Sequence, residues 1–419
     1  MFVKDRNLMT FLAITLFYFF EAAQMSYFNV IAPGLKLHGI SYDQISAISA
    51  AYYYGDMIGL LPAGFALDRF ELRKVLLWAI LGSIVGASLL LVSDDYYVQW
   101  VARFICGFFG GTFSFIGGIR VLAGLFQKRF TFFMGLFLSA GMFGGLICQY
   151  PLLMAVNHFG MQGATSIMVI FGTVVMFCSV LFLYPIPIAK PGTTLKKPWR
   201  KTWVTILKNY RNWGDCLMVV LLDTPVSIIG TLWGVVILMN VYHFSDITST
   251  FIVMSLFLGL MIGLPLWGII ADKYNESAWI IIVGAGMSAI LCAFMLWTPK
   301  PDPVLIGGLF FGLGFFSSCQ TLGFTWLTRN MQPEIIGQNS AFNSMIFMGT
   351  NGGFKQLGGY LLASLTVIKF GSSAANLLGL ILISMAITVV YAIFRHTLFP
   401  SNQPAAIAHS FSSTQQLII

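Results

Sequence analysis

Six ionisable side chains fall inside long apolar stretches of the sequence, where a charge is least expected. An ionisable group at the middle of a bilayer costs about 2.5 kcal/mol or more, so each one predicts a function or a buried partner. The acids of this set could carry protons, and the bases could bind anionic groups. The six residues are Glu21, Asp56, Arg103, Arg120, Asp223 and Lys355.

The carboxyl groups predict proton transfer. Glu21 lies near the middle of its apolar stretch, and Gln24 lies on roughly the same helical face. A carboxyl group held away from water can take up and release a proton, so we predict proton coupling at Glu21, Asp56 and Asp223. The alternatives are a static pair with a basic residue for Glu21, a contact with a neighbouring helix for Asp56, and capping beside Pro225 for Asp223.

Lys355 is the clearest candidate for binding an anionic group. The corresponding position of an earlier, similar stretch holds the apolar Ile147, so the charge is specific to the later stretch. We predict that Lys355 contacts an anionic group of a substrate together with Asn351 and Gln356. A lysine that reaches out to water is the alternative. Gln24 and Tyr53 complete the predicted substrate-binding residues.

A short charged motif occurs twice, separated by about half of the chain. The first copy occupies 64–69 and the second occupies 268–273, and each joins two apolar stretches. We predict that these residues latch the inner ends of the helices and that breaking the latch is one step of gating. Anchoring of the loop alone is the alternative. The predicted gating residues are Asp68, Arg69, Arg73, Asp272 and Lys273.

The composition requires a solvent that is mostly lipid. The chain is 58% hydrophobic and 9% charged, with a mean hydropathy of +0.83, whereas a soluble domain has about 25% charged residues. A helix needs about 20 apolar residues to cross a bilayer. Twelve stretches meet this requirement and predict an all-α membrane protein: 8–33, 43–67, 74–93, 97–125, 131–155, 163–185, 215–240, 248–271, 278–298, 303–327, 337–366 and 374–395.

Lysine and arginine residues predict the side on which each loop lies. If both termini are cytoplasmic, most loop cations are also cytoplasmic, and the outer loops hold Lys36, Lys300 and Lys369. This topology explains the net charge of +8 without a nucleic-acid partner.

Glycine clusters indicate that the chain is duplicated. Those at 107–111 and 141–145 recur at 312–314 and 349–353, at nearly one spacing. Glycines let helices approach closely in lipid, and duplicated bundles place a site between their halves. We therefore predict two pseudo-symmetric six-helix bundles. The predicted domains are 1–185 and 215–396 for the bundles, 186–214 for a cytoplasmic linker, and 397–419 for a disordered cytoplasmic tail.

The linker carries a pattern typical of an amphipathic helix. Trp199, Trp203, Ile206, Tyr210 and Trp213 recur at helical spacing, with basic residues off that face. Such a helix lies on a membrane surface. A helix that binds a partner protein is the alternative.

Signals for enzymatic chemistry are missing from the sequence. The cysteines are scattered singly without a CxxC pair, and the histidines lie in loops or in the tail. No GxxxxGK[ST] motif is found, so ATP is not the predicted energy source. We predict no enzymatic activity, no cofactor and no metal.

The first loop motif and the fourth stretch resemble the major facilitator superfamily. Gly64, Asp68, Arg69, Arg73 and Lys74 resemble its signature between the second and third helices, although Glu71 stands about where its second glycine is usual. Arg103, Phe104, Gly107 and Gly111 resemble its fourth-helix motif. The resemblance implies the twelve-helix fold, transport of a solute, a monomer, and proton coupling or packing at Arg103.

Other segments are similar to bacterial nutrient permeases of the phagosomal transporter type. That group implies uptake of amino acids and related nutrients across a bacterial inner membrane. Its members have an arginine one turn after the glutamate of the first helix, where this chain has Met25. The similar segments are Phe19-Phe20-Glu21, Ala51-Tyr52-Tyr53-Tyr54 and Leu61-Pro62-Ala63-Gly64.

These observations predict a secondary active transporter that works by alternating access. Our main prediction is proton-coupled uptake of a small polar organic solute such as an amino acid, a short peptide or an organic acid. The alternative is a proton-driven exporter of drugs or a siderophore. The fifth helix lacks the Gly-Pro pair of such exporters, because Met142 follows Gly141. A membrane receptor or scaffold that transports nothing is a third possibility, which the buried charges disfavour.

Overall fold

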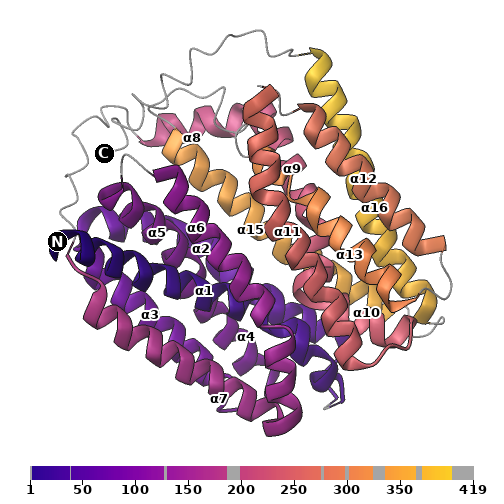
Figure 1. The fold of residues 1–419 in the computed structure, drawn as a ribbon, viewed down its shortest axis with the longest axis horizontal. Coiled ribbons are helices and arrows are strands. Elements are labelled where there is room, and N and C mark those ends of the chain that lie inside the picture. The colour runs from indigo at the N-terminus through magenta and orange to yellow at the C-terminus, as the bar shows by residue number, and fades with distance from the viewer. Residues whose placement is uncertain are drawn as a thin grey trace.

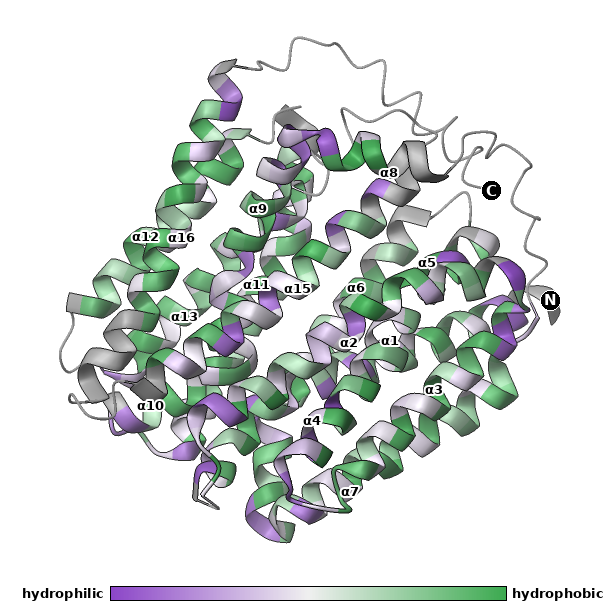
Figure 2. Ribbon diagram, turned by 180° about the vertical axis from the view of Figure 1, so that it is seen from behind, coloured by the Kyte–Doolittle hydropathy of each residue, from purple (hydrophilic) through white to green (hydrophobic). Residues whose placement is uncertain are grey.

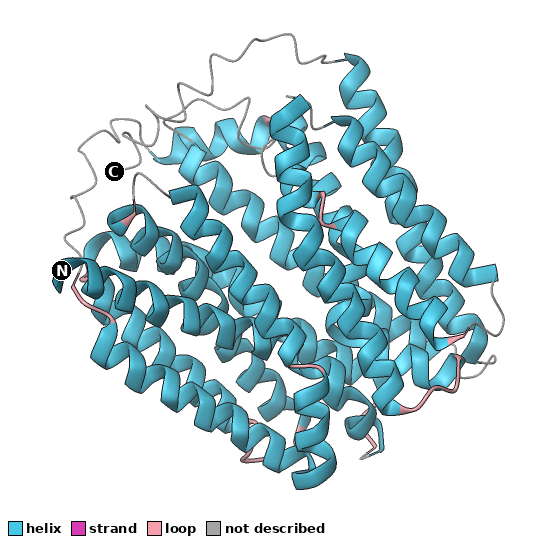
Figure 3. Cartoon of the chain, viewed as in Figure 1, coloured by secondary structure: helices cyan, strands magenta, loops and turns pink. Residues whose placement is uncertain are grey.

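The computed structural model describes residues 2–37, 39–126, 130–185, 199–274, 278–297, 302–323, 336–364 and 370–398. The regular structure of these residues is helical, and no strand occurs among them (Figure 3). Helices satisfy their own backbone hydrogen bonds, which lipid cannot do. The predicted all-α membrane class is confirmed.

The N-terminal half begins its helices at clear capping residues. Ser41 accepts from the Gln44 N–H while the Gln44 side chain accepts from the Ser41 N–H, a capping box that fixes the start of α2. Asp95 caps α4 in the same region of space. The elements are α1 (Phe2–Leu37), α2 (Tyr42–Arg69), α3 (Leu72–Leu89), α4 (Tyr96–Ile105), η1 (Cys106–Gly111), α5 (Thr112–Leu125), α6 (Phe130–Ile147) and α7 (Tyr150–Phe182).

The C-terminal half repeats this arrangement after a short amphipathic helix. Asn209 caps the first membrane helix and Asp302 caps a later one. The elements are α8 (Trp199–Lys208), α9 (Tyr210–Thr224), η3 (Pro225–Trp233), α10 (Gly234–Val241), α11 (Asp246–Tyr274), α12 (Ala278–Trp297), α13 (Pro303–Ser317), α15 (Ile336–Ser364) and α16 (Phe370–Leu398).

The two halves form two groups of helices that lie side by side (Figure 1). Helices α1 to α7 make one group, and α9 to α16 make the other. In Figure 1, α1 begins at the left, α16 ends at the top, and α8 lies between these two ends. We call this end of the bundle the termini side and the opposite end the far side.

The described helices account for the predicted twelve traverses. Nine ranges are long and apolar enough to cross a membrane, and one of them, Leu136–Phe182, contains two traverses that meet at Gly160. Helices α2 and α15 are also long enough to cross, but tyrosines, glycines and polar residues lower their hydropathy. These two helices carry several of the predicted site residues.

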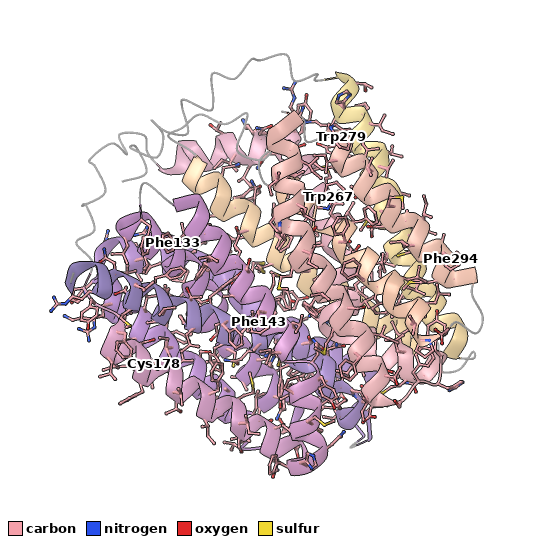
Figure 4. The ribbon with its side chains drawn as sticks, in the orientation of Figure 1. Phe133, Phe143, Cys178, Trp267, Trp279 and Phe294 are labelled. Carbon is pink, nitrogen blue, oxygen red and sulfur yellow. The ribbon has the colours of Figure 1, made fainter. Side chains whose placement is uncertain are left out.

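The lipid-facing surface is apolar. In Figure 2 the hydrophobic colour runs along the helices, and hydrophilic residues gather mainly at helix ends. Figure 4 places Phe294 at the outer flank of the C-terminal half and Phe143 near the middle of the molecule. Trp267 is buried instead, and its indole N–H donates to the Phe315 carbonyl at 2.8 Å. The helices are therefore apolar on both faces, as a membrane requires.

The same glycine-mediated crossing occurs in both halves. In the N-terminal half, a Cβ on Gly107 would overlap the backbone of α2, and one on Gly55 would overlap the backbone of α4. In the C-terminal half, Gly314 and Gly259 bring α13 and α11 together in the same way. Backbones this close leave no room for a side chain, which explains the repeated glycines.

Two membrane helices contain a π-helical segment at equivalent depths. In one, η1 joins α4 to α5, and in the other, η3 follows Asp223 and begins at Pro225. Proline removes a backbone donor and favours such an interruption. Short π segments occur often at functional sites, and both segments here lie beside buried charges.

Two predicted boundaries differ from the observed helices. The fifth stretch is interrupted at Cys148 and Gln149, because Pro151 starts a new helix, and α7 then runs through the expected loop to Gly160. The predicted amphipathic helix of the linker is split at Asn209, where α9 begins. Residues 186–198 of the linker and 399–419 of the tail lie outside the described residues.

Candidate functional site

Glu21 lies in α1, is 2% exposed, and is held by neutral donors. Ser83 Oγ on α3 donates to Glu21 Oε1 at 2.6 Å, and Tyr52 OH on α2 donates to Oε2 at 3.3 Å. Gln24 Nε2 donates to Ser83 Oγ at 2.9 Å. A carboxyl group with only neutral partners can accept a proton without breaking an ion pair.

Arg103 lies next to this network without closing an ion pair. Its Nη1 donates to the Gln24 carbonyl at 2.9 Å, and its guanidinium carbon lies 4.6 Å from the Phe28 ring centre and 4.8 Å from that of Tyr52. The side chain is fully buried, and its Nε and Nη2 have no hydrogen-bond partner. Aromatic faces stabilise this cation through their quadrupoles.

Asp56 lies one helical turn beyond Tyr52 on α2 and is bonded to a hydroxyl. Thr112 Oγ1 on α5 donates to Asp56 Oδ1 at 2.6 Å and lies 2.8 Å from the Asp56 carbonyl. Both side chains are buried. The contact can hold Asp56 in either protonation state, because the hydroxyl can donate or accept.

Glycines of η1 make room for both carboxyl groups. A Cβ on Gly110 would overlap the Glu21 carboxylate, and a Cβ on Gly111 would lie 2.8 Å from Asp56 Oδ2. The fourth-helix glycines therefore admit acidic side chains as well as a neighbouring backbone. The sequence predicted close helix packing here, but not this second purpose.

Lys355 lies in α15 and is fully buried with no hydrogen-bond partner for its ammonium group. Its Nζ lies 4.3 Å from the ring centre of Tyr53 on α2. The contact joins the C-terminal half to the N-terminal half. The predicted alternative of a lysine reaching water does not describe this side chain.

Asp223 is close to Lys355 and is held by amides. Asn351, one turn before Lys355, donates its Nδ2 to Asp223 Oδ2 at 2.8 Å, and the Gln320 side chain lies near this carboxylate. The remaining side-chain oxygens Asn351 Oδ1 and Gln320 Oε1 have no partner. A negative charge, two free acceptors and a free ammonium group therefore lie within one region of the C-terminal half.

The central charges are not neutralised by direct pairing. Within the described part of the chain, no oppositely charged side chain lies within 4.0 Å of Glu21, Asp56, Arg103, Asp223 or Lys355. A buried ion pair does occur elsewhere in the described part of the chain, between Arg395 Nε and Asp215 Oδ1 at 3.2 Å near the termini side. Tyr391 OH also donates to Asp215. That pair braces helix ends.

Two predicted substrate-binding residues make their hydrogen bonds elsewhere. The Gln24 side chain donates to Ser83 in the N-terminal network, and the Gln24 backbone carbonyl accepts from Arg103. Gln356 is exposed on another face of α15, where its Oε1 accepts from Tyr54 OH at 2.9 Å. Gln356 also lines a cavity of about 480 Å³ that opens on the far side between α2, α4 and α15.

The predicted gating residues make contacts within their own half. Arg69 lies over the Phe65 ring at 4.1 Å, and Arg73 Nη2 donates to the Val180 carbonyl at 2.7 Å. Arg120, also in this region, donates to the Leu67 carbonyl at 2.8 Å, which ties two helix ends. The side chains of Asp68, Asp272 and Lys273 lie outside the described residues, so the latch stays a prediction.

The sequence did not indicate a set of buried hydrogen bonds that joins the halves through Asn29. Asn29 on α1 donates to Gln149 Oε1 at 2.8 Å, and the backbone N–H of Val235 on α10 donates to Asn29 Oδ1 at 3.4 Å. The side chains of Asn29 and Gln149 are fully buried. An amide inside an apolar helix could have indicated these hydrogen bonds, because a buried amide needs a partner.

The halves meet along the contact between α2 and α15, which runs from mid-depth to the far side and which we call the seam. Gly359 of α15 packs against Ser46 and the Tyr42 backbone, and Gly349 packs against Met57 near mid-depth. Farther along α2 toward the termini side, Leu61 is 50% and Phe65 is 53% exposed. The described contacts of α2 with α15 therefore run from mid-depth to the far side, and α2 residues nearer the termini side are exposed.

Comparisons with known proteins agree with this architecture. The family model described as Major Facilitator Superfamily matches residues 14–354. The fold is similar to the crystal structure of a mutant of the nucleoside transporter NupG, with a TM-score of 0.72 and 13% identity, over 94% of this chain and 98% of that one. No curated protein sequence matches the chain.

Proposed function

Because the chain belongs to the major facilitator superfamily and is a transporter, we propose that it imports a small polar solute with an anionic group by alternating access. Uptake is coupled to protons. The proposed solutes are amino acids, short peptides and organic acids.

The fully buried and unpartnered ammonium group of Lys355 carries this proposal. A buried charge is costly unless an opposite charge or hydrogen bonds compensate it. Lys355 has a ring beside it and a carboxylate nearby that Asn351 holds. An anionic group of a solute between the halves would supply the missing acceptors. The free oxygens of Asn351 and Gln320 would accept from donors of the same solute.

Proton coupling is assigned to Glu21, with Asp56 and Asp223 as further carriers. Glu21 is bonded to Ser83 and Tyr52, and each hydroxyl can reverse its hydrogen bond when the carboxyl group is protonated. Arg103 lies beside the same tyrosine and would stabilise the deprotonated form. Such an arrangement supports uptake driven by a pH gradient.

The transport proposed is import across a bacterial inner membrane by a monomer with cytoplasmic termini. Basic loop residues favour the cytoplasm for the termini side. In this orientation the contacts of α2 with α15 lie toward the outer side, and the exposed residues of α2 lie toward the cytoplasm. The domains proposed are 1–185, 186–214, 215–396 and 397–419, with gating at the charged loops between helices.

Thermal stabilisation of the purified protein by a panel of solutes tests the proposal. The panel contains amino acids, dipeptides, dicarboxylates, nucleosides, amphipathic cations and siderophores, each at a mildly acidic and a mildly alkaline pH. A ligand at about 100 times its Kd stabilises the folded state by about 2.7 kcal/mol. We expect hits among anionic or zwitterionic solutes, with stronger stabilisation at one pH.

Two variants sharpen the panel. Lys355→Met should abolish stabilisation by an anionic hit, whereas Lys36→Met, at an exposed lysine near the far side, should preserve it. Hits confined to amphipathic cations or siderophores would contradict import and support export. A hit confined to nucleosides, which the NupG likeness makes worth including, would contradict the role of Lys355, because nucleosides carry no anion at neutral pH.

A further inference from the structure

An empty carrier must stabilise Lys355 without a solute. Alternating access returns the empty binding site to the outer side in every cycle of net uptake, and a buried ammonium group without a direct partner opposes that step. The Lys355 ammonium is fully buried and has no hydrogen-bond partner. Some other group must therefore compensate it in the empty state.

The Tyr53 ring is placed to compensate that charge. It belongs to α2 of the other half, is 3% exposed, and has its centre 4.3 Å from Lys355 Nζ. A desolvated ring face attracts an ammonium group strongly. The hydroxyl of Tyr53 lies near Thr231 of η3.

Other charged groups near Lys355 do not replace the ring. Asp223 acts on Lys355 through space but forms no ion pair with it within 4.0 Å and accepts from Asn351 instead. Arg103 acts on Lys355 as a like charge from the N-terminal half. The two buried basic side chains therefore contact the rings of consecutive tyrosines: Arg103 lies over Tyr52, and Lys355 lies over Tyr53.

We propose that Tyr53 is a positioning residue that takes the place of the solute at Lys355 and allows the empty carrier to return. This inference rests on the proposed function of Lys355 as the anion-binding residue. In the loaded carrier, the ammonium group of Lys355 binds the anionic group of the solute instead of the Tyr53 ring. Tyr53 is then dispensable for movement of the loaded protein.

Separate measurement of net uptake and exchange tests the inference. Proteoliposomes are loaded either with buffer or with an unlabelled mixture of the common amino acids, and entry of the radiolabelled mixture is followed. Net uptake needs the empty carrier to return, whereas exchange does not. We expect Tyr53→Leu to slow net uptake by about tenfold more than it slows exchange.

Two further variants control for packing. Tyr53→Phe keeps the ring and loses only the hydroxyl, so it should keep net uptake near the wild-type rate. Tyr54→Leu makes the same change at the next residue, whose hydroxyl binds Gln356 rather than the ammonium group, and should slow neither process selectively. Equal loss of both processes in Tyr53→Leu would overturn the proposal, because Tyr53 would then be a solute contact. Unchanged net uptake would overturn it as well.

A measurement without any solute keeps the test independent of the substrate. Ser46 lies in the seam against Gly359, so Ser46→Cys reports opening of the far side through labelling by an impermeant maleimide. Added Tyr53→Leu should raise labelling several-fold in the empty protein, whereas Tyr53→Phe should not. Equal labelling would refute the role of Tyr53.

The failure of the proposed function has a different signature. If Lys355 does not bind the solute, Lys355→Met will retain exchange, whatever Tyr53→Leu does. If Lys355 binds the solute but Tyr53 has no special role, Lys355→Met will lose exchange while Tyr53→Leu leaves net uptake and labelling unchanged.

Discussion

Helices α6 and α15 carry matching glycine clusters but pack on different partners. Gly144 of α6 lies against the backbone of Phe19, on α1 of its own half. Gly349 and Gly352 of α15 lie against side chains of α2, in the opposite half, and α15 packs more extensively on α2 than on any helix of its own half. Gly145 of α6 also meets Phe257 of α11, so α6 reaches the other half as well. The motif therefore packs mainly within its own half in α6 and mainly across the halves in α15.

The two halves differ in the same way at their glycine crossings. Helices α2 and α4 cross like α11 and α13, and Thr112 and Ser318 lie at corresponding positions beside Gly59 and Gly263. Asp56 binds Thr112, whereas the position that corresponds to Asp56 is the buried Leu260. Both halves have the same glycine crossing, but at corresponding positions only one half has the charged residue. Each charge can therefore be tested against the residue that the other half uses.

Lys355→Ile gives α15 the residue that α6 has at its corresponding position, Ile147. Removing one partner of a buried charge contact costs about 2–5 kcal/mol, so binding of an anionic solute should weaken by about 30-fold or more. Isothermal titration with a hit from the solute panel measures this. Unchanged affinity would mean that the asymmetry of α6 and α15 has no role in recognition.

Glu21→Gln removes the acid from the N-terminal network and keeps its shape. Uptake driven by an inward proton gradient should fall by about tenfold or more, because the amide cannot carry a proton. Exchange without a gradient should continue. Parallel uptake assays with and without the gradient decide the matter, and full gradient-driven uptake in the variant would exclude Glu21 as the coupling site.

Gly359→Val tests whether α2 and α15 need their close approach. A side chain there would meet Ser46 and the Tyr42 backbone, and overpacking of about 1–3 kcal/mol should slow uptake by about tenfold. Gly353→Ala is the matched control on the same helix, because nothing lies within 4 Å of the added Cβ. Equal rates in both variants would show that the seam tolerates separation.

Asp56→Leu gives α2 the residue of α11 and has the smallest expected effect on folding. Thr112 loses one acceptor but keeps the Asp56 carbonyl, so the free energy of unfolding should fall by about 1 kcal/mol. Uptake should also lose part of its dependence on pH. Denaturant unfolding and a pH series of uptake test the two effects, and an intact pH series would make Asp56 a structural residue.

Much of the fold could be predicted from the sequence, because burial in lipid depends on local composition. The all-α membrane class and the superfamily are confirmed. Burial of Glu21 and Lys355 also followed from their apolar surroundings. The break at Cys148 was missed, since Pro151 is a weak local signal inside an apolar run. The roles of the site residues and the domain limits stay predictions.

The sequence by itself determined that this chain lies in a membrane, is duplicated, and buries charges in both halves. These properties follow from the free energy of moving each stretch of side chains from water to lipid. That free energy depends on the composition of the stretch, which the sequence already gives. Only the tertiary structure decided the partners: Ser83 for Glu21, Thr112 for Asp56, and Tyr53 for Lys355. Those contacts join helices far apart in the chain, and backbone approach at glycines decides which side chains can meet.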